Sequence, residues 1–168
     1  DQVDERYSVE KSTEAACKYL NEAYQKFGSW TLAAASYNMG VGGVSNQLSR
    51  QRVDNYFNLF LNEETSRYIF RTLAIKEIMN NPAKYGFGIK PEDCYQPIPT
   101  KEIEITSSIP DLINYAESLG VNYKILKMLN PWLRNSKLTL TKNDSYTVKI
   151  PEKGVYKIYT KEDLIPKN

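Results

Sequence analysis

A stretch rich in proline and glycine, residues 86–101, is the feature that most constrains the fold of this chain. It holds two glycines and three prolines in sixteen positions, which stiffens the backbone and disfavours both a helix and a central strand. The residues before and after it follow different periodicities. We therefore predict a first part over 1–87, a linker over 88–101, and a second part over 102–168 that ends in a C-terminal tail.

The first part has the pattern of a helical domain. Apolar residues recur every three or four positions, and each such run follows a residue whose side chain can cap a helix. The predicted helices cover 9–27, 30–38 and 63–79, with Ser8, Ser29 and Asn62 as N-caps, Gly28 after the first, and the glycines 40, 42 and 43 ending the second.

The second part alternates between strand and helix patterns, which makes the expected fold class α+β. Residues 102–106 alternate strictly, as a half-buried strand does. The predicted order is a strand at 102–106, a helix from Ile109 to Leu119 capped by Ser108, a helix after Asn122 through Leu129, a strand at 146–150, and a further edge strand at 155–159. A unit of about fifty residues is only marginally stable alone.

The composition excludes several kinds of function. The chain has no histidine, so mechanisms that need an imidazole base or a histidine zinc site are ruled out. Its formal net charge of +2 gives no electrostatic case for nucleic acid, and it has no apolar run of membrane-spanning length. Thirteen tyrosines suit contacts to sugars or to a wet interface. Cys17 and Cys94 are either free thiols or one long-range disulfide.

The densest local signal is the run from Ala35 to Gly40, with the sequence Ala-Ser-Tyr-Asn-Met-Gly. Tyr37 and Asn38 fall in the last turn of the predicted second helix. Gly40 lets the backbone turn away without placing a side chain in front of them. From the residues alone, the run is either an ordinary helix C-cap or a site that presents a phenol and an amide at a helix end.

This run resembles the third conserved block, Ala-x-Tyr-Asn-x-Gly, of the lytic murein transglycosylases, which have a lysozyme-like fold. Two more segments resemble parts of that family in the right order. The first of them resembles the stretch before the third block in the membrane-bound D group of the family. These segments are Lys26-Phe27-Gly28-Ser29-Trp30, after Asp4-Glu5-Arg6, and Glu64-Thr65-Ser66-Arg67-Tyr68-Ile69. The resemblance covers about residues 3–87 and implies that this is the C-terminal part of the catalytic domain. It also implies that Tyr37, Asn38, Gly40 and Tyr68 line the glycan cleft.

The second part resembles the lysin motif, a small domain that binds glycans containing N-acetylglucosamine. The residues that carry the likeness are Gly120-Val121, Leu126, Asn130-Pro131, Leu133 and Ile150-Pro151. The chain departs from the motif at residues 107–110, where the family has Gly-Asp-Thr-Leu. The loops 107–109 and 130–133 are expected to lie nearest each other. The residues implied for glycan contact are Ser107, Ser108, Ile109, Asn130, Pro131 and Trp132; Trp132 either stacks on a sugar face or packs against the first part or the linker.

The resemblance implies cleavage of the β-1,4 bond between N-acetylmuramic acid and N-acetylglucosamine, with a 1,6-anhydro product. A single glutamic acid does the proton work, so no cofactor and no metal are expected. In the family this residue lies in a Glu-Ser block. The only such pair in the chain, Glu117-Ser118, falls in the second part, and Glu64 starts a helix, where the dipole favours an ionised carboxylate. We therefore expect no catalytic acid in this chain and place it upstream.

The leading hypothesis is thus that this chain is part of a peptidoglycan lytic transglycosylase and is inactive on its own. The alternatives are a non-catalytic peptidoglycan-binding envelope protein and a helical interaction protein. The expected partner is the peptidoglycan glycan strand, and nucleic acid is not one. The expected location is the periplasm or cell envelope, with any outer-membrane anchor upstream.

Overall fold

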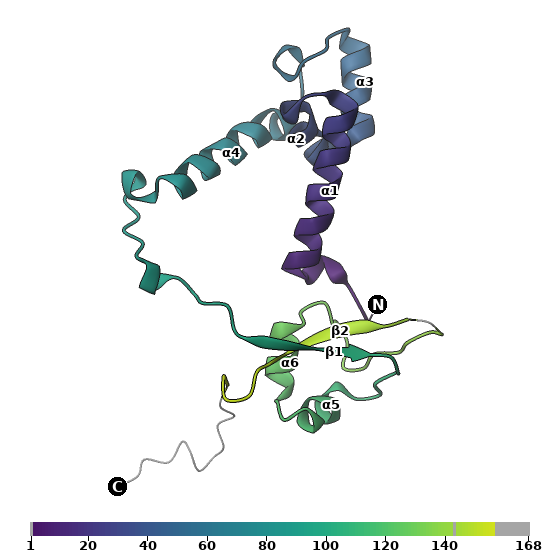
Figure 1. Ribbon diagram of the computed structural model, residues 1–168. Helices are drawn as coiled ribbons and strands as arrows, with labels where there is room; N and C mark the ends of the chain where they lie inside the picture. The colour runs from purple at the N-terminus through teal and green to yellow at the C-terminus, as the bar shows by residue number, and fades with distance from the viewer. Residues whose placement is uncertain (1, 143, 157–168) are drawn as a thin grey trace. The chain divides into compact units, whose positions relative to one another are not determined.

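The computed structural model describes residues 2–142 and 144–156 (Figure 1). The chain divides into two compact units. Unit 1 comprises Asp1–Ser12 and Gln96–Asn168, and unit 2 comprises Thr13–Tyr95. Unit 2 is therefore inserted into unit 1 in the order of the sequence. The domain boundaries at 87 and 102 remain predictions, and the units differ from them because the first twelve residues group with the second half.

Four helices account for most of the chain up to residue 80. They are α1 Val9–Phe27, which starts in unit 1 and continues into unit 2, α2 Trp30–Met39, α3 Val41–Gln51 and α4 Glu63–Asn80. Single 3-10 turns lie at Glu5–Tyr7, Tyr56–Asn58, Pro82–Tyr85 and Pro91–Asp93. The three predicted N-caps are confirmed, since the side chains of Ser8, Ser29 and Asn62 accept from the backbone N–H groups of Lys11, Leu32 and Thr65.

The prediction that three glycines end the second helix is wrong for two of them. Gly40 alone separates α2 from α3, with φ of +82° and ψ of 151°, a region that only glycine adopts at little cost. Gly42 and Gly43 lie inside α3. The change of direction at Gly40 is complete within one residue, so the next helix starts immediately at Val41.

The core of unit 2 forms where α2 packs against α3 and α4. Its buried members are Leu32, Ala35, Val44, Tyr56 and Ile69. The hydroxyl of Tyr56 donates to the carbonyl of Ser66 at 2.7 Å, which ties the 3-10 turn to α4. Burial raises the pKa of this phenol, so Tyr56 stays neutral and serves the core.

Unit 1 has the predicted order of strand, helix, helix and strand, and the α+β fold class is confirmed. The elements are β1 Thr100–Ile105, α5 Leu112–Ser118, α6 Tyr123–Leu129 and β2 Tyr146–Pro151. The strands are antiparallel, with Ile103 opposite Val148. Asn122 caps α6 as predicted. The core side chains of both strands and both helices include Ile105, Leu112, Leu126, Val148 and Ile150.

Three boundaries in unit 1 differ from the predictions. Helix α5 starts at Leu112 with Asp111 as its N-cap, because Ile109 exchanges both backbone hydrogen bonds with Leu138 and a residue before proline disfavours helical backbone. Strand β1 begins at Thr100, so the predicted linker overlaps it by two residues. Of the predicted edge strand at 155–159, Val155 and Tyr156 are not in a strand, and 157–159 lie outside the described residues.

Candidate functional site

The end of α2 presents Tyr37 and Asn38, as the motif predicted. The buried Ser36 supports them, because its carbonyl accepts from the hydroxyl of Tyr19 at 2.6 Å and from the N–H of Gly40 at 2.7 Å. The ring of Tyr37 meets that of Tyr19 edge-on at 5.5 Å and is 47% exposed. Tyr37 is thus positioned on one edge and open to solvent elsewhere.

The amide of Asn38 is held by the start of α4. The buried hydroxyl of Thr65 donates to Asn38 Oδ1 at 2.7 Å, and Asn38 Nδ2 donates to Glu64 Oε1 at 3.3 Å. Tyr68 lies one turn after Glu64 and therefore on the same face of α4. The fold thus brings Asn38 to the α4 face that carries Tyr68, and Thr65 fixes which end of the amide points outward.

Glu64 has the surroundings of a structural carboxylate. It is exposed in the first turn of α4 and lies in no apolar pocket formed by the described residues. Its contact to Asn38 orients the amide. A glycosidase acid instead needs a partly apolar pocket that keeps it protonated, so these surroundings fit the expectation that the acid comes from elsewhere.

In unit 1, a hollow of about 340 Å³ lies beside the start of α5. Three of the predicted glycan contacts, Ser107, Ser108 and Ile109, line it together with Asp111 and Tyr115. The Ser108 hydroxyl accepts from the N–H of Leu140 at 2.9 Å, which fixes this wall. Burial raises the pKa of the Tyr115 phenol, so the hollow offers hydroxyl groups and an aromatic ring.

Two of the other predicted contacts in unit 1, Asn130 and Trp132, are buried. Asn130 is fully buried: its Nδ2 donates to the carbonyls of Leu126 and Lys149 at 2.8 and 2.7 Å, and its Oδ1 accepts from the N–H of Lys149 at 2.7 Å. Trp132 is 7% exposed and stacks on Tyr146 at 5.3 Å. Trp132 therefore packs within its own unit, and Pro131 is half-buried beside it.

The expectation that loops 107–109 and 130–133 lie nearest each other stays a prediction. The backbone bridges of these loops go to other segments: Ile109 pairs with Leu138, and Leu133 pairs with Val3 near the N-terminus. The N-terminal contribution was not predicted. Its one signal in the sequence is Val3 between the polar residues Gln2 and Asp4, a pattern typical of a short extended segment.

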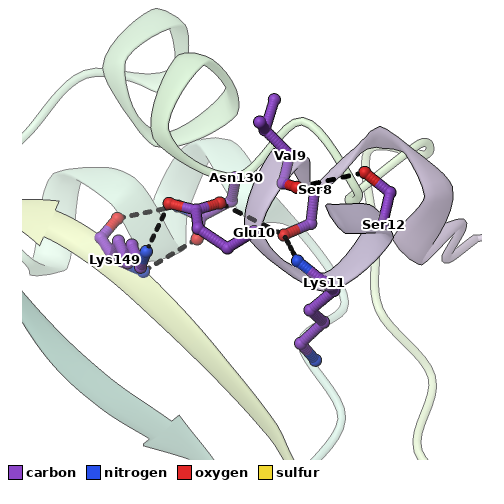
Figure 2. Close-up of polar contacts among 7 residues, drawn as sticks. All are labelled: Ser8, Val9, Glu10, Lys11, Ser12, Asn130 and Lys149. Atoms are coloured by element: carbon purple, nitrogen blue, oxygen red, sulfur yellow. Dashed lines mark hydrogen bonds and ion pairs between the residues drawn. The ribbon is translucent and has the colours of Figure 1, made fainter. Parts of the chain in front are cut away.

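The segment Gln2–Glu10, which we call the N-terminal clasp, lies on unit 1. Figure 2 shows its end, where the Glu10 carboxylate reaches the Lys149 amine at 2.8 Å, next to the buried Asn130. This ion pair lowers the pKa of Glu10 and raises that of Lys149. Closer to the N-terminus, the Arg6 guanidinium and backbone N–H lower the pKa of Asp4 to about 2.

Three further observations describe the surface chemistry. Among the described residues, no group of three or more histidine, cysteine, aspartate or glutamate side chains gathers as a metal site. No helix in the described part of the chain has the length and apolarity needed to cross a membrane. Cys17 is a free, exposed thiol, and the Cys94 thiol contacts the carbonyl of Lys90 at 3.7 Å.

Two stretches of the chain match known families. Residues 1–60 match the transglycosylase SLT domain, which includes the Tyr37–Gly40 segment. Residues 101–154 match the soluble lytic transglycosylase C-terminal LysM-like domain. The resemblance to lytic transglycosylases is confirmed by these two matches in their order along the chain.

The chain is also similar to a particular pair of curated proteins. It is 28% identical over 155 residues to membrane-bound lytic murein transglycosylase D of Escherichia coli strain K12. The protein of the same name from Escherichia coli O6:H1 has the same identity over the same length. The alignment covers 89% of this chain and 33% of each relative, so the chain spans about a third of the length of the proteins it matches.

Proposed function

We propose that this chain is part of a lytic transglycosylase that cleaves the N-acetylmuramic acid–N-acetylglucosamine β-1,4 bond of peptidoglycan and leaves a 1,6-anhydro product. In this proposal Tyr37, Asn38 and Tyr68 contact the glycan strand, and Gly40 keeps the helix end open. The catalytic glutamate comes from a segment upstream of these residues. The protein acts in the cell envelope, where its substrate is.

The observation that carries the proposal is the fixed amide of Asn38. Thr65 holds Asn38 Oδ1 at 2.7 Å, so one N–H of the side-chain amide has a set direction. The half-exposed Tyr37 ring precedes it in the chain, and an aromatic face beside an oriented amide suits an N-acetylated sugar. The SLT match over the same residues supports this assignment.

For unit 1 we propose a glycan contact at the hollow beside α5, with Ser107, Ser108 and Ile109 as one wall. Asn130 and Trp132 support that unit from inside, and Pro131 is half-buried beside them. Replacing the exposed Asn114 of the hollow by alanine is expected to lower retention on insoluble peptidoglycan. Trp132→Ala is expected to reduce stability by about 3–5 kcal/mol, the usual cost of truncating a buried aromatic side chain.

The test compares the 168-residue chain with the longest natural form of the protein on purified sacculi. Mass spectrometry of the soluble fraction measures release of 1,6-anhydro-muropeptides. The longer form is expected to release them and the short chain is not. In the longer form, Asn38→Ala and Tyr68→Ala are expected to lower the rate at least about tenfold. Tyr95→Ala is the matched control because Tyr95 is fully exposed at 103%.

Each other result selects a different conclusion. Release by the short chain would show that the acid lies within it. Retention of the longer form on sacculi without any release would favour the non-catalytic peptidoglycan-binding protein. If the longer form is neither retained nor active, the helical interaction protein is the better description.

A further inference from the structure

The N-terminal clasp binds unit 1 through its backbone. The N–H of Asp4 donates to the carbonyl of Trp132 at 2.9 Å, and the N–H of Arg134 donates to the carbonyl of Gln2 at 2.8 Å. Val3 pairs with Leu133 between these bonds and packs against the core of unit 1. The clasp therefore forms an isolated antiparallel bridge with the segment around Leu133, in which backbone groups of both segments are paired.

Side chains make this contact specific to the clasp sequence. Gln2 Oε1 accepts from the N–H of Thr139 at 2.6 Å, and Gln2 Nε2 donates to Thr139 Oγ1 at 3.2 Å. The Arg134 guanidinium lies 4.0 Å from the centre of the Tyr7 ring, a cation–π contact. The ion pair of Glu10 with Lys149 closes the other end. A bidentate amide, an aromatic ring and a carboxylate each have a matching partner.

The surface that holds the clasp is distinct from the hollow beside α5. It uses Trp132, Leu133, Arg134, Thr139 and Lys149, none of which lines the hollow. Unit 1 thus presents two separate surfaces. One contacts an extended segment of this chain, and the other has the hydroxyl groups proposed for glycan.

We propose that the LysM-like unit is an intramolecular docking module whose partner is the N-terminal clasp, in addition to its proposed glycan contact. The clasp continues directly into α1, whose first turn belongs to unit 1 and whose remainder belongs to unit 2. Docking therefore holds the first turn of α1 within unit 1. Unit 2 lies in sequence between the docked clasp and Gln96, where unit 1 resumes. Docking therefore closes a loop of chain, which restricts the conformations of unit 2 in its unfolded state.

Amide hydrogen exchange of the full 168-residue chain tests the docking without any glycan. The N–H groups of Asp4, Arg134 and Thr139 all donate across the contact and report on it directly. Val3→Asp places a charge against the core of unit 1 and is expected to accelerate their exchange at least about tenfold. Ile113→Asp is the control: a similar change at a 47% exposed residue of unit 1 that lies outside the clasp and its contacts is expected to keep the rates within about twofold.

Swapping the two charges of the Glu10–Lys149 ion pair provides a second test that does not depend on Val3. Glu10→Lys and Lys149→Glu are each expected to accelerate exchange of the three amides, and the double variant is expected to restore much of their protection. The docking proposal fails if Val3→Asp leaves the three rates unchanged, or if Ile113→Asp accelerates them equally. If Val3→Asp unfolds unit 1 altogether, the swap of the two charges is the deciding test. A double variant whose three amides exchange as fast as in the single variants would overturn the proposal.

Discussion

The buried amide of Asn130 gives the sharpest test of how unit 1 is held together. Its side chain satisfies both the N–H and the carbonyl of Lys149 and also bonds the carbonyl of Leu126. Lys149 is opposite Glu102 in the ladder, and both its backbone groups point to Asn130. In an antiparallel pair, alternate residues turn these groups away from the partner strand, so Asn130 takes the place of a further strand at that point of β2.

The cost of removing this side chain can be worked from those contacts. In Asn130→Ala the carbonyl of Leu126 keeps a partner, because the backbone N–H of residue 130 still donates to it at 3.1 Å. The N–H and carbonyl of Lys149 lose theirs, at about 1–3 kcal/mol for each unsatisfied group. Since Lys149 is only half-buried, we expect the summed loss for its two groups to lie in the lower part of that range, at about 3 kcal/mol.

Urea unfolding followed by tryptophan fluorescence measures this loss. The chain has two tryptophans, so a Trp30→Phe background leaves Trp132 as the sole reporter, and Trp132 lies in unit 1. Asn114→Ala, at an exposed helical asparagine, is the matched control and is expected to change stability by less than about 0.5 kcal/mol. A loss below about 1 kcal/mol in Asn130→Ala would refute the reasoning. Reduced glycan retention at unchanged stability would instead make Asn130 a binding residue.

Three further outcomes follow from the contacts described. Gly40→Ala is expected to destabilise unit 2 by about 1–3 kcal/mol through backbone strain alone, since a Cβ there meets no atom within 4 Å; thermal unfolding followed by the fluorescence of Trp30 checks it. Thr65→Val keeps the shape but frees Asn38 Oδ1, and it is expected to cost about 1–2 kcal/mol and to lower product release in the longer form more than it lowers the melting temperature. Glu10→Gln removes the ion pair with Lys149, which lowers the pKa of Glu10 from 4.5 in the folded chain. The stability that this carboxylate contributes is therefore present above pH 4.5 and is lost as the pH falls further. Denaturation curves of the native and variant chains should converge in acid, and a constant difference would contradict this.

Local chemistry made the helical half of the chain predictable. Helix caps and glycines act over a few residues, which is why Ser8, Ser29 and Asn62 were placed correctly. The same locality explains the error at Ser108. A serine before Ile109 looks like a cap, but the hydrogen bonds of Ile109 to Leu138, across 29 residues, hold that backbone extended.

The motif of Tyr37 and Asn38 could be recognised in the sequence, but its geometry could not. The sequence contains Tyr37, Asn38 and Tyr68 in family order, and the SLT match extends over the first two. That Asn38 is oriented by Thr65, 27 positions away, depends on how α2 packs against α4. Periodicity shows which face of a helix is apolar and leaves open which residues of another helix meet it.

The sequence by itself determined the N-caps and approximate extents of α1, α2 and α4, the α+β class and the resemblance to lytic transglycosylases, because these depend on short-range patterns. Tertiary structure alone decided the rest. It buried Asn130 and Trp132 inside unit 1, left Ser107 at an open hollow, and placed Val3 beside Leu133 across 130 residues of chain. Such pairings are set by which open strand edge and which apolar patch remain unsatisfied after local structure has formed, and no local window of sequence contains both partners.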